Sequence, residues 1–222
     1  MIMKTKHENK NGRVAGFVTV GLLIAGIMFT PKPAKADSIE FMAGNKNAVV
    51  DLKAGADITK KLGFFLRARP SQDFATGNIS PFGLTDLTVN VTSGFDTVGE
   101  LQFIGGSAVP RVGMQAYTGL GDFGLYNLTT VGMDSKSYVE FLTSLNYLPV
   151  ISSGLKLLAR VEDVSDVSRD GHLWSTQRLR LGLTIKEWGF GTATDLTETG
   201  NKPKLADGTF ERNFGGFVSK TF

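Results

Sequence analysis

Alternation of apolar and polar residues, repeated in segment after segment, is the feature that most restricts how this chain of 222 residues can fold. In the segment 176–186, TQRLRLGLTIK, apolar side chains occupy every second position from Leu179 to Ile185. The segments 48–58 (AVVDLKAGADI) and 86–92 (DLTVNVT) alternate in the same way. A period of two residues is that of a β-strand with one apolar face, and no long amphipathic helix pattern interrupts these segments. We therefore predict an all-β fold.

The start of the chain has a different pattern, which is typical of a secretory signal peptide. A basic head precedes an apolar run at 14–29, and Ala34 and Ala36 provide a small-residue cleavage site. The apolar run is shorter than the roughly 20 residues that a membrane-spanning helix needs, and an uncleaved anchor is the alternative. We predict a cleaved signal peptide at 1–36 and a mature domain at 37–222.

Removal of this leader changes the net charge. The leader holds six of the 24 Lys and Arg and one of the 21 Asp and Glu, which leaves 18 basic and 20 acidic residues and a net charge of −2. Nucleic-acid binding needs a concentrated basic surface and is not expected. The chain contains no Cys, which excludes a disulfide scaffold and thiolate metal sites, and the mature part contains a single His. We expect no cofactor and no metal.

The number of strand-like segments indicates a closed barrel. Eleven segments fall between residues 48 and 222, and the segment 38–44 (SIEFMAG) supplies a twelfth. Three long connections, at 70–83, 164–174 and 197–208, then all follow odd-numbered strands and lie at one end. Bacterial transmembrane barrels have an even number of antiparallel strands, short turns at one end and longer loops at the other. We predict a transmembrane antiparallel up-and-down β-barrel of twelve strands, with ten strands as the alternative.

The last segment, ERNFGGFVSKTF, ends on an aromatic residue and places Phe214, Val218 and Phe222 in one strand phase. With the leader, the alternating strands and the one-sided loops, it resembles the bacterial outer-membrane β-barrel proteins, whose last strand ends in this way. Lys220 departs from that pattern. The resemblance implies a Gram-negative outer membrane, contact with its lipid, and a barrel assembly machinery that reads the three apolar residues. Twelve strands are also similar to small channels for acidic sugars and to the outer-membrane phospholipase, but no motif identifies a subfamily.

In a barrel, one phase of each strand faces the lumen. The predicted strands place ten charged residues in that phase: Arg67, Arg69, Glu100, Arg111, Glu140, Lys156, Arg160, Glu162, Arg178 and Arg180. Arg binds carboxylates and phosphates bidentately, so the set could favour anionic solutes. We favour the other interpretation, in which Arg and Glu of neighbouring strands pair and fill a narrow lumen, because acids are nearly as numerous as bases.

The favoured function is a porin-like passive channel for small solutes, with anions as a candidate class. The alternatives are a closed-lumen barrel whose outer loops bind a partner or ligand, and a soluble secreted β-sandwich. We do not expect an enzyme, because His172 has Ser168 and Ser175 nearby in sequence but in no catalytic spacing.

Aromatic residues near the predicted strand ends are expected to form girdles at the two membrane interfaces. They are Tyr117, Tyr126, Tyr138, Tyr147, Trp174, Trp188, Phe210 and Phe222. Arg212 and Lys220 share the lipid-facing phase of the last segment. They are tolerable near the membrane interfaces, where the free-energy cost of a lipid-facing Arg or Lys falls to roughly 0–1 kcal/mol.

Overall fold

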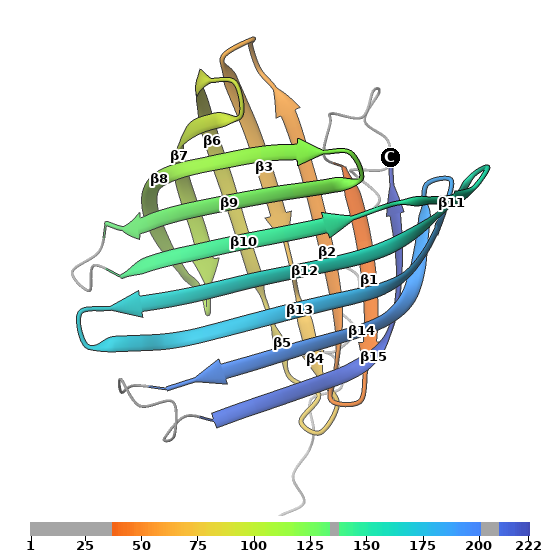
Figure 1. Cartoon of the computed structure of the whole chain (residues 1–222). Helices are drawn as coiled ribbons and strands as arrows, with labels where there is room; N and C mark the ends of the chain where they lie inside the picture. The colour runs from red at the N-terminus through yellow and green to blue at the C-terminus, as the bar shows by residue number, and fades with distance from the viewer. Residues whose placement is uncertain (1–36, 134–137, 201–208) are drawn as a thin grey trace, which may run out of the picture. The chain divides into compact units, whose positions relative to one another are not determined.

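The computed structural model describes residues 37–133, 138–200 and 209–222, which form a closed antiparallel barrel (Figure 1). The predicted signal peptide lies outside the described residues. None of the described residues belongs to a helix long and apolar enough to cross a membrane. The barrel strands are β1 (Ser38–Gly44), β2 (Asn47–Asp57), β3 (Leu62–Ala68), β6 (Phe82–Thr92), β7 (Phe95–Ile104), β8 (Ser107–Leu120), β9 (Phe123–Gly132), β10 (Val139–Tyr147), β12 (Leu155–Ser168), β13 (Gly171–Ile185), β14 (Trp188–Thr199) and β15 (Thr209–Thr221). Three short strands lie outside the ring: β4 (Ser71–Asp73), β5 (Ile79–Ser80) and β11 (Val150–Ser152).

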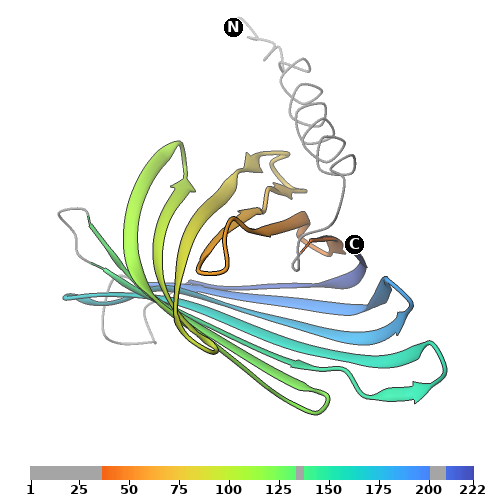
Figure 2. The ribbon, with the colours of Figure 1, turned by 90° about the horizontal axis from the view of Figure 1, so that it is seen from above.

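The first and last strands of the chain close the ring. β1 pairs with β2 along one edge and with β15 along the other, and β1 lies beside β15 in Figure 2. The backbone N–H of Phe222 donates to the carbonyl of Asp37 at 3.0 Å. Each barrel strand therefore has two neighbours, and no open edge remains among them, which is what a bilayer requires. The predicted twelve-stranded barrel is confirmed.

The two ends of the barrel differ in their connections. We call the end that carries Ser38 and Thr221 the terminus side and the opposite end the loop side. On the loop side, the connection between β3 and β6 contains β4 and β5, and β4 pairs with the first residues of β2. This short hairpin forms part of the long connection expected at 70–83.

The prediction of a long loop at 164–174 is wrong. β12 continues to Ser168 and β13 begins at Gly171, so only Arg169 and Asp170 turn the chain. The indole N–H of Trp174 donates to the Asp166 carboxylate at 2.8 Å across these two strands. Polar residues on both faces hide the apolar alternation here, although the strand pairing continues.

The outer face of the barrel carries a band of exposed apolar side chains. The band includes Leu87, Val89, Leu101, Phe103, Val112, Met114, Phe141, Val161, Leu179, Leu181, Phe190, Phe214 and Val218. Arg212 lies 4.9 Å from the ring centroid of Phe210, and Lys220 lies 4.7 Å from that of Phe222. An apolar exterior flanked by aromatic and basic residues suits the lipid of a bilayer.

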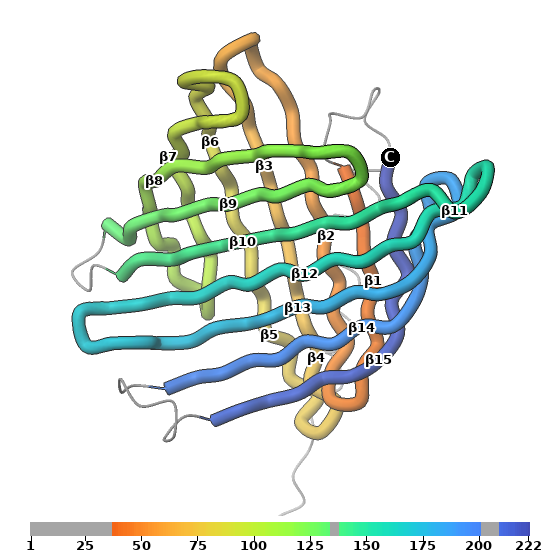
Figure 3. Tube along the Cα trace, viewed as in Figure 1, coloured from red at the N-terminus to blue at the C-terminus, as the bar shows by residue number. Residues whose placement is uncertain are grey.

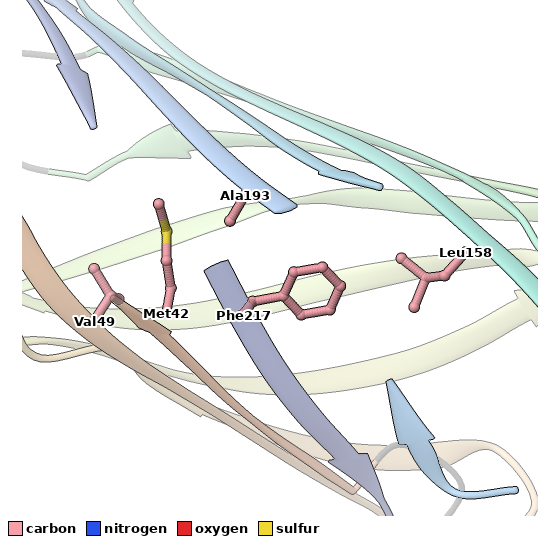
Figure 4. Close-up of a cluster of buried hydrophobic side chains, with 5 residues drawn as sticks. All are labelled: Met42, Val49, Leu158, Ala193 and Phe217. Atoms are coloured by element: carbon pink, nitrogen blue, oxygen red, sulfur yellow. The ribbon is translucent and has the colours of Figure 1, made fainter. Parts of the chain in front are cut away.

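The interior holds small apolar clusters as well as charges. Figure 4 shows one of them, formed by Met42, Val49, Leu158, Ala193 and Phe217. Phe217 breaks the polar phase of β15, and only 3% of it is exposed. Apolar side chains therefore occupy part of the space that the sequence assigned to polar lumen residues.

One glycine allows β15 to lie unusually close to β1. Gly215 of β15 pairs with Gly44 of β1, and β15 changes direction along its length (Figure 3). A methyl group added to Gly215 would lie 1.8 Å from the carbonyl oxygen of Ala43. Glycine at such a position lets a barrel wall bend sharply.

Candidate functional site

Arg67 lies at the centre of an ion-pair network inside the barrel. Its Nε donates to Asp51 at 2.8 Å, and its Nη2 donates to Glu162 at 2.9 Å. Glu162 also accepts from Arg178 and lies 3.5 Å from the Lys53 ammonium. Because Arg67 belongs to β3 and Glu162 to β12, these contacts join the two walls that face each other in Figure 1.

A second group of ion pairs continues the network toward β1 and β14. Arg180 donates to Glu40 at 2.7 Å and to Asp195 at 2.8 Å, and Asp195 also accepts from Arg69 at 2.7 Å. Arg160 bonds to the other oxygen of Glu40. We call the whole network the septum, and its members are Glu40, Asp51, Lys53, Arg67, Arg69, Arg160, Glu162, Arg178, Arg180 and Asp195. Six basic and four acidic side chains give the septum a net charge of +2.

Two cavities end at the septum. A cavity of about 520 Å³ reaches Lys53, Arg67 and Glu162, and its other lining residues come mainly from the terminus-side halves of the strands. A smaller cavity of about 130 Å³ reaches Arg69 and Asp195 and is otherwise lined from the loop side. Between the septum side chains only about 10 Å³ is free. That space is close to the minimum for one water molecule, so the septum separates the two cavities.

A second buried cluster lies among β6, β7, β8, β9, β10 and β12, and acids outnumber bases in it. It contains Asp86, Glu100, Gln102, Arg111, Thr130, Glu140 and Asp166. Arg111 lies 3.3 Å from the Glu100 carboxylate and 3.5 Å from that of Asp166, and it donates to the Thr130 hydroxyl at 2.7 Å. Gln102 donates to Glu140 at 3.1 Å. Within the part of the chain that the structure describes, no group of three or more acids or histidines is arranged to hold a metal ion.

The structure brings most of the predicted lumen residues together. Six of them belong to the septum, namely Arg67, Arg69, Arg160, Glu162, Arg178 and Arg180. Glu100, Arg111 and Glu140 belong to the second buried cluster. Lys156 is exposed and takes part in neither group.

The sequence analysis did not select several acids of these networks, although strand phase contained the information. Glu40 lies between Ile39 and Phe41, and Asp51 lies between Val50 and Leu52, so both are in the polar phase of their strands. The same holds for Asp86 and Asp195, whereas Asp166 lies in the segment 164–174 that was expected to be a loop. Their importance comes from their partners, which lie on strands far away in the sequence.

Four aromatic residues assigned to a membrane girdle face the interior instead. Tyr117 lines the cavity of about 520 Å³, and the Tyr138 ring lies 4.5 Å from the guanidinium of buried Arg111. The Tyr126 hydroxyl donates to Gln115 at 2.9 Å, and Trp174 bonds to Asp166. Tyr126 shares the inward phase of β9 with buried Leu128. The girdle prediction is wrong for these four, because an aromatic ring with a polar tip can also find its partners inside a barrel.

His172 lies near the start of β13 and pairs in register with Val167. The Ser168 hydroxyl donates to the carbonyl of Gly171 at 3.3 Å, and Ser175 is buried. These contacts give neither serine the base-activated geometry of a nucleophile.

No family model and no curated protein matches this sequence. Several solved structures do match. The NanC porin is 7% identical, with 84% of this chain and 99% of that chain covered and a TM-score of 0.50. The KdgM porin in complex with disordered oligogalacturonate is 9% identical over 84% and 99% of the two chains, with a TM-score of 0.49. LpxR from Salmonella typhimurium is 10% identical over 85% and 100%, with a TM-score of 0.43.

The chain has the fold of the small outer-membrane porins. At such low identity the similarity shows the fold alone. The predicted outer-membrane β-barrel is confirmed at that level, and the apolar outer face agrees with an outer-membrane location.

Proposed function

We propose that this chain is a narrow outer-membrane channel for small solutes, closed at the septum in the conformation described. One observation carries the proposal: two cavities approach each other from opposite ends of the barrel, and the septum that separates them consists of side chains. Long Arg side chains change rotamer without movement of the barrel wall. Opening therefore requires exchange of ion-pair partners and no unfolding of a strand.

The composition of the septum supports a preference for anions. Each of its six bases has an acidic partner, but four acids serve all six, so Glu162 alone contacts Arg67, Arg178 and Lys53. An entering carboxylate or phosphate can take over one of these shared guanidinium groups bidentately. A cation has no corresponding excess of acid to bind at this level of the barrel.

Planar-bilayer recording tests the channel itself. We expect small conductance steps from the wild type and steps several times larger from Asp51→Ala/Arg67→Ala, which removes one acid and one base and widens the septum. The control is Asn127→Ala/Thr143→Ala, an exposed side-chain pair that shares a hydrogen bond of 2.9 Å. This control should conduct like the wild type. Absence of steps from inserted wild type and septum variant alike would exclude a channel.

Reversal potentials in a KCl gradient test the anion preference. We expect chloride to be preferred in the wild type because of the septum charge of +2. Arg160→Gln/Arg178→Gln removes two positive charges, and its reversal potential should move toward zero. A wild-type preference for potassium would contradict the proposal.

A closed-lumen barrel is the second candidate, and the free space of about 10 Å³ at the septum favours it. In that case the loop side would carry the function by binding a partner or ligand. The soluble β-sandwich considered from sequence is wrong, because the sheet closes into a ring. For either kind of barrel we propose that the chain has no catalytic role. We also propose that it contacts outer-membrane lipid and that the assembly machinery recognises Phe214, Val218 and Phe222.

A further inference from the structure

The terminus-side cavity, which we call the vestibule, has an unbalanced set of charges. Its two basic residues, Lys53 and Arg67, already form ion pairs with Asp51 and Glu162 of the septum. Three further carboxylates line the vestibule, and they belong to Asp57, Asp86 and Asp96. In the described ranges of the chain, none of these three forms an ion pair with a base. The vestibule is therefore an electronegative space.

Asp96 is held in place by neutral donors. Its carboxylate accepts from the Gln115 amide at 2.7 Å and from the Asn90 amide at 2.8 Å. Gln115 in turn accepts from the Tyr126 hydroxyl at 2.9 Å. This chain of hydrogen bonds across β6, β7, β8 and β9 orients the carboxylate and one aromatic ring without neutralising the charge.

Asp86 supplies an independent indication of a cation site. Only 3% of this residue is exposed, and its Oδ1 has no hydrogen-bond partner within the described part of the chain. Its neighbour across the β6–β7 pair is Glu100, another acid. A buried carboxylate without a basic partner must take up a proton or meet a cation. Because Asp86 lines the vestibule, a cation bound there could meet it.

Aromatic rings line the same cavity. Phe65, Tyr117 and Tyr126 contribute to its wall, and ring faces attract cations, with quaternary ammonium groups as the typical case. The volume of about 520 Å³ is within the usual range for a small organic ligand. Metal ions need a compact set of oxygen ligands, which the described residues do not provide.

We propose that the vestibule binds a small organic cation of the alkylammonium class. Asp86 and Asp96 supply the charge, and the aromatic rings contact the alkyl groups. The site is separate from the proposed solute path in one respect: a cation held there faces a septum of net charge +2 and is not expected to pass it. Binding therefore occurs whether or not the barrel conducts.

Isothermal titration calorimetry on the full chain, refolded in detergent micelles, tests this proposal with choline as the probe. We expect wild-type binding that weakens about tenfold or more in Asp96→Asn and in Asp86→Asn, since each loses a charge that acts in a partly desolvated site. Asp170→Asn, at an exposed turn on the loop side, is the matched control and should bind like the wild type. The uncharged carbon analogue dimethylbutanol should bind at least tenfold more weakly than choline.

Heat-modifiable migration on a gel verifies that each variant is folded. Two results would overturn the site: no choline binding by folded wild type, or equal binding by the control and the two vestibule variants. Equal affinity for dimethylbutanol would overturn the assignment to cations. Since calorimetry does not depend on conductance, a failure here is distinguishable from a failure of the channel proposal.

Discussion

Gly215→Ala will prevent the barrel from closing, whereas Gly216→Ala will leave it intact. The added methyl group at Gly215 would lie 1.8 Å from the Ala43 carbonyl oxygen, and backbone at that position cannot rotate away. At Gly216 the nearest atom would be 3.5 Å away, which is an ordinary contact. Overpacking a tight site costs about 1–3 kcal/mol, and a clash with paired backbone is at the upper end or beyond.

Gel migration of unheated and heated samples measures this difference after refolding into detergent. The wild type and Gly216→Ala should both show a folded, heat-modifiable band, and Gly215→Ala should show little or none. Because the two glycines are neighbours in β15, strand propensity and position along the strand are matched. Equal folding of both variants would mean that β1 and β15 can separate at this point.

Arg67→Ala will destabilise the barrel more than the double variant Asp51→Ala/Arg67→Ala. Removal of Arg67 leaves Asp51 and Glu162 close together, and the side chains of both are at least nine-tenths buried. Asp51 then keeps only the longer contacts with Lys53 at 3.8 Å and Arg69 at 3.9 Å. Because the closest partner of a buried charge is lost, we expect a cost that approaches the about 3–5 kcal/mol of a broken buried ion pair. The double variant also removes one of the acids, and Glu162 keeps Lys53 and Arg178 as partners.

Urea unfolding in lipid vesicles measures the free energy of each variant. The matched control is Lys156→Ala, which removes an exposed base of β12 and should change stability by less than about 0.5 kcal/mol. We expect the double variant to lose more unfolding free energy than the control and less than Arg67→Ala. A loss for Arg67→Ala as small as that for Lys156→Ala would show that the septum does not contribute to stability.

The barrel could be predicted because its main constraint is local. Alternation identifies a strand from about ten residues, and the position of the long connections indicated that 38–44 must be a further strand. The rule failed at 164–174, where Ser165 and Asp166 are polar on opposite faces. There the strand is specified by its pairing with β13, and pairing is not visible in a single segment.

The septum could be predicted only in part. Strand phase directed Arg67 and Glu162 inward, but they are 95 positions apart in the chain, and alternation cannot show that they meet. Strand phase also cannot distinguish an aromatic side chain whose polar tip lies at the membrane interface from one whose polar tip lies in the interior. This explains why the girdle prediction failed for Tyr126. Partners across a closed ring depend on the radius and tilt of the ring, and those arise from all strands together.

Pairing between β1 and β15 also makes the last strand decisive for folding. Until β15 is in place, both edges of the sheet expose unpaired backbone groups, and such edges invite pairing with other chains. The ring contact joins residues almost a whole domain apart, so it forms late and depends on an intact C-terminal strand. A chain that lost β15 would be an open sheet with two unpaired edges and not a slightly less stable barrel. We expect proteases to degrade such a chain.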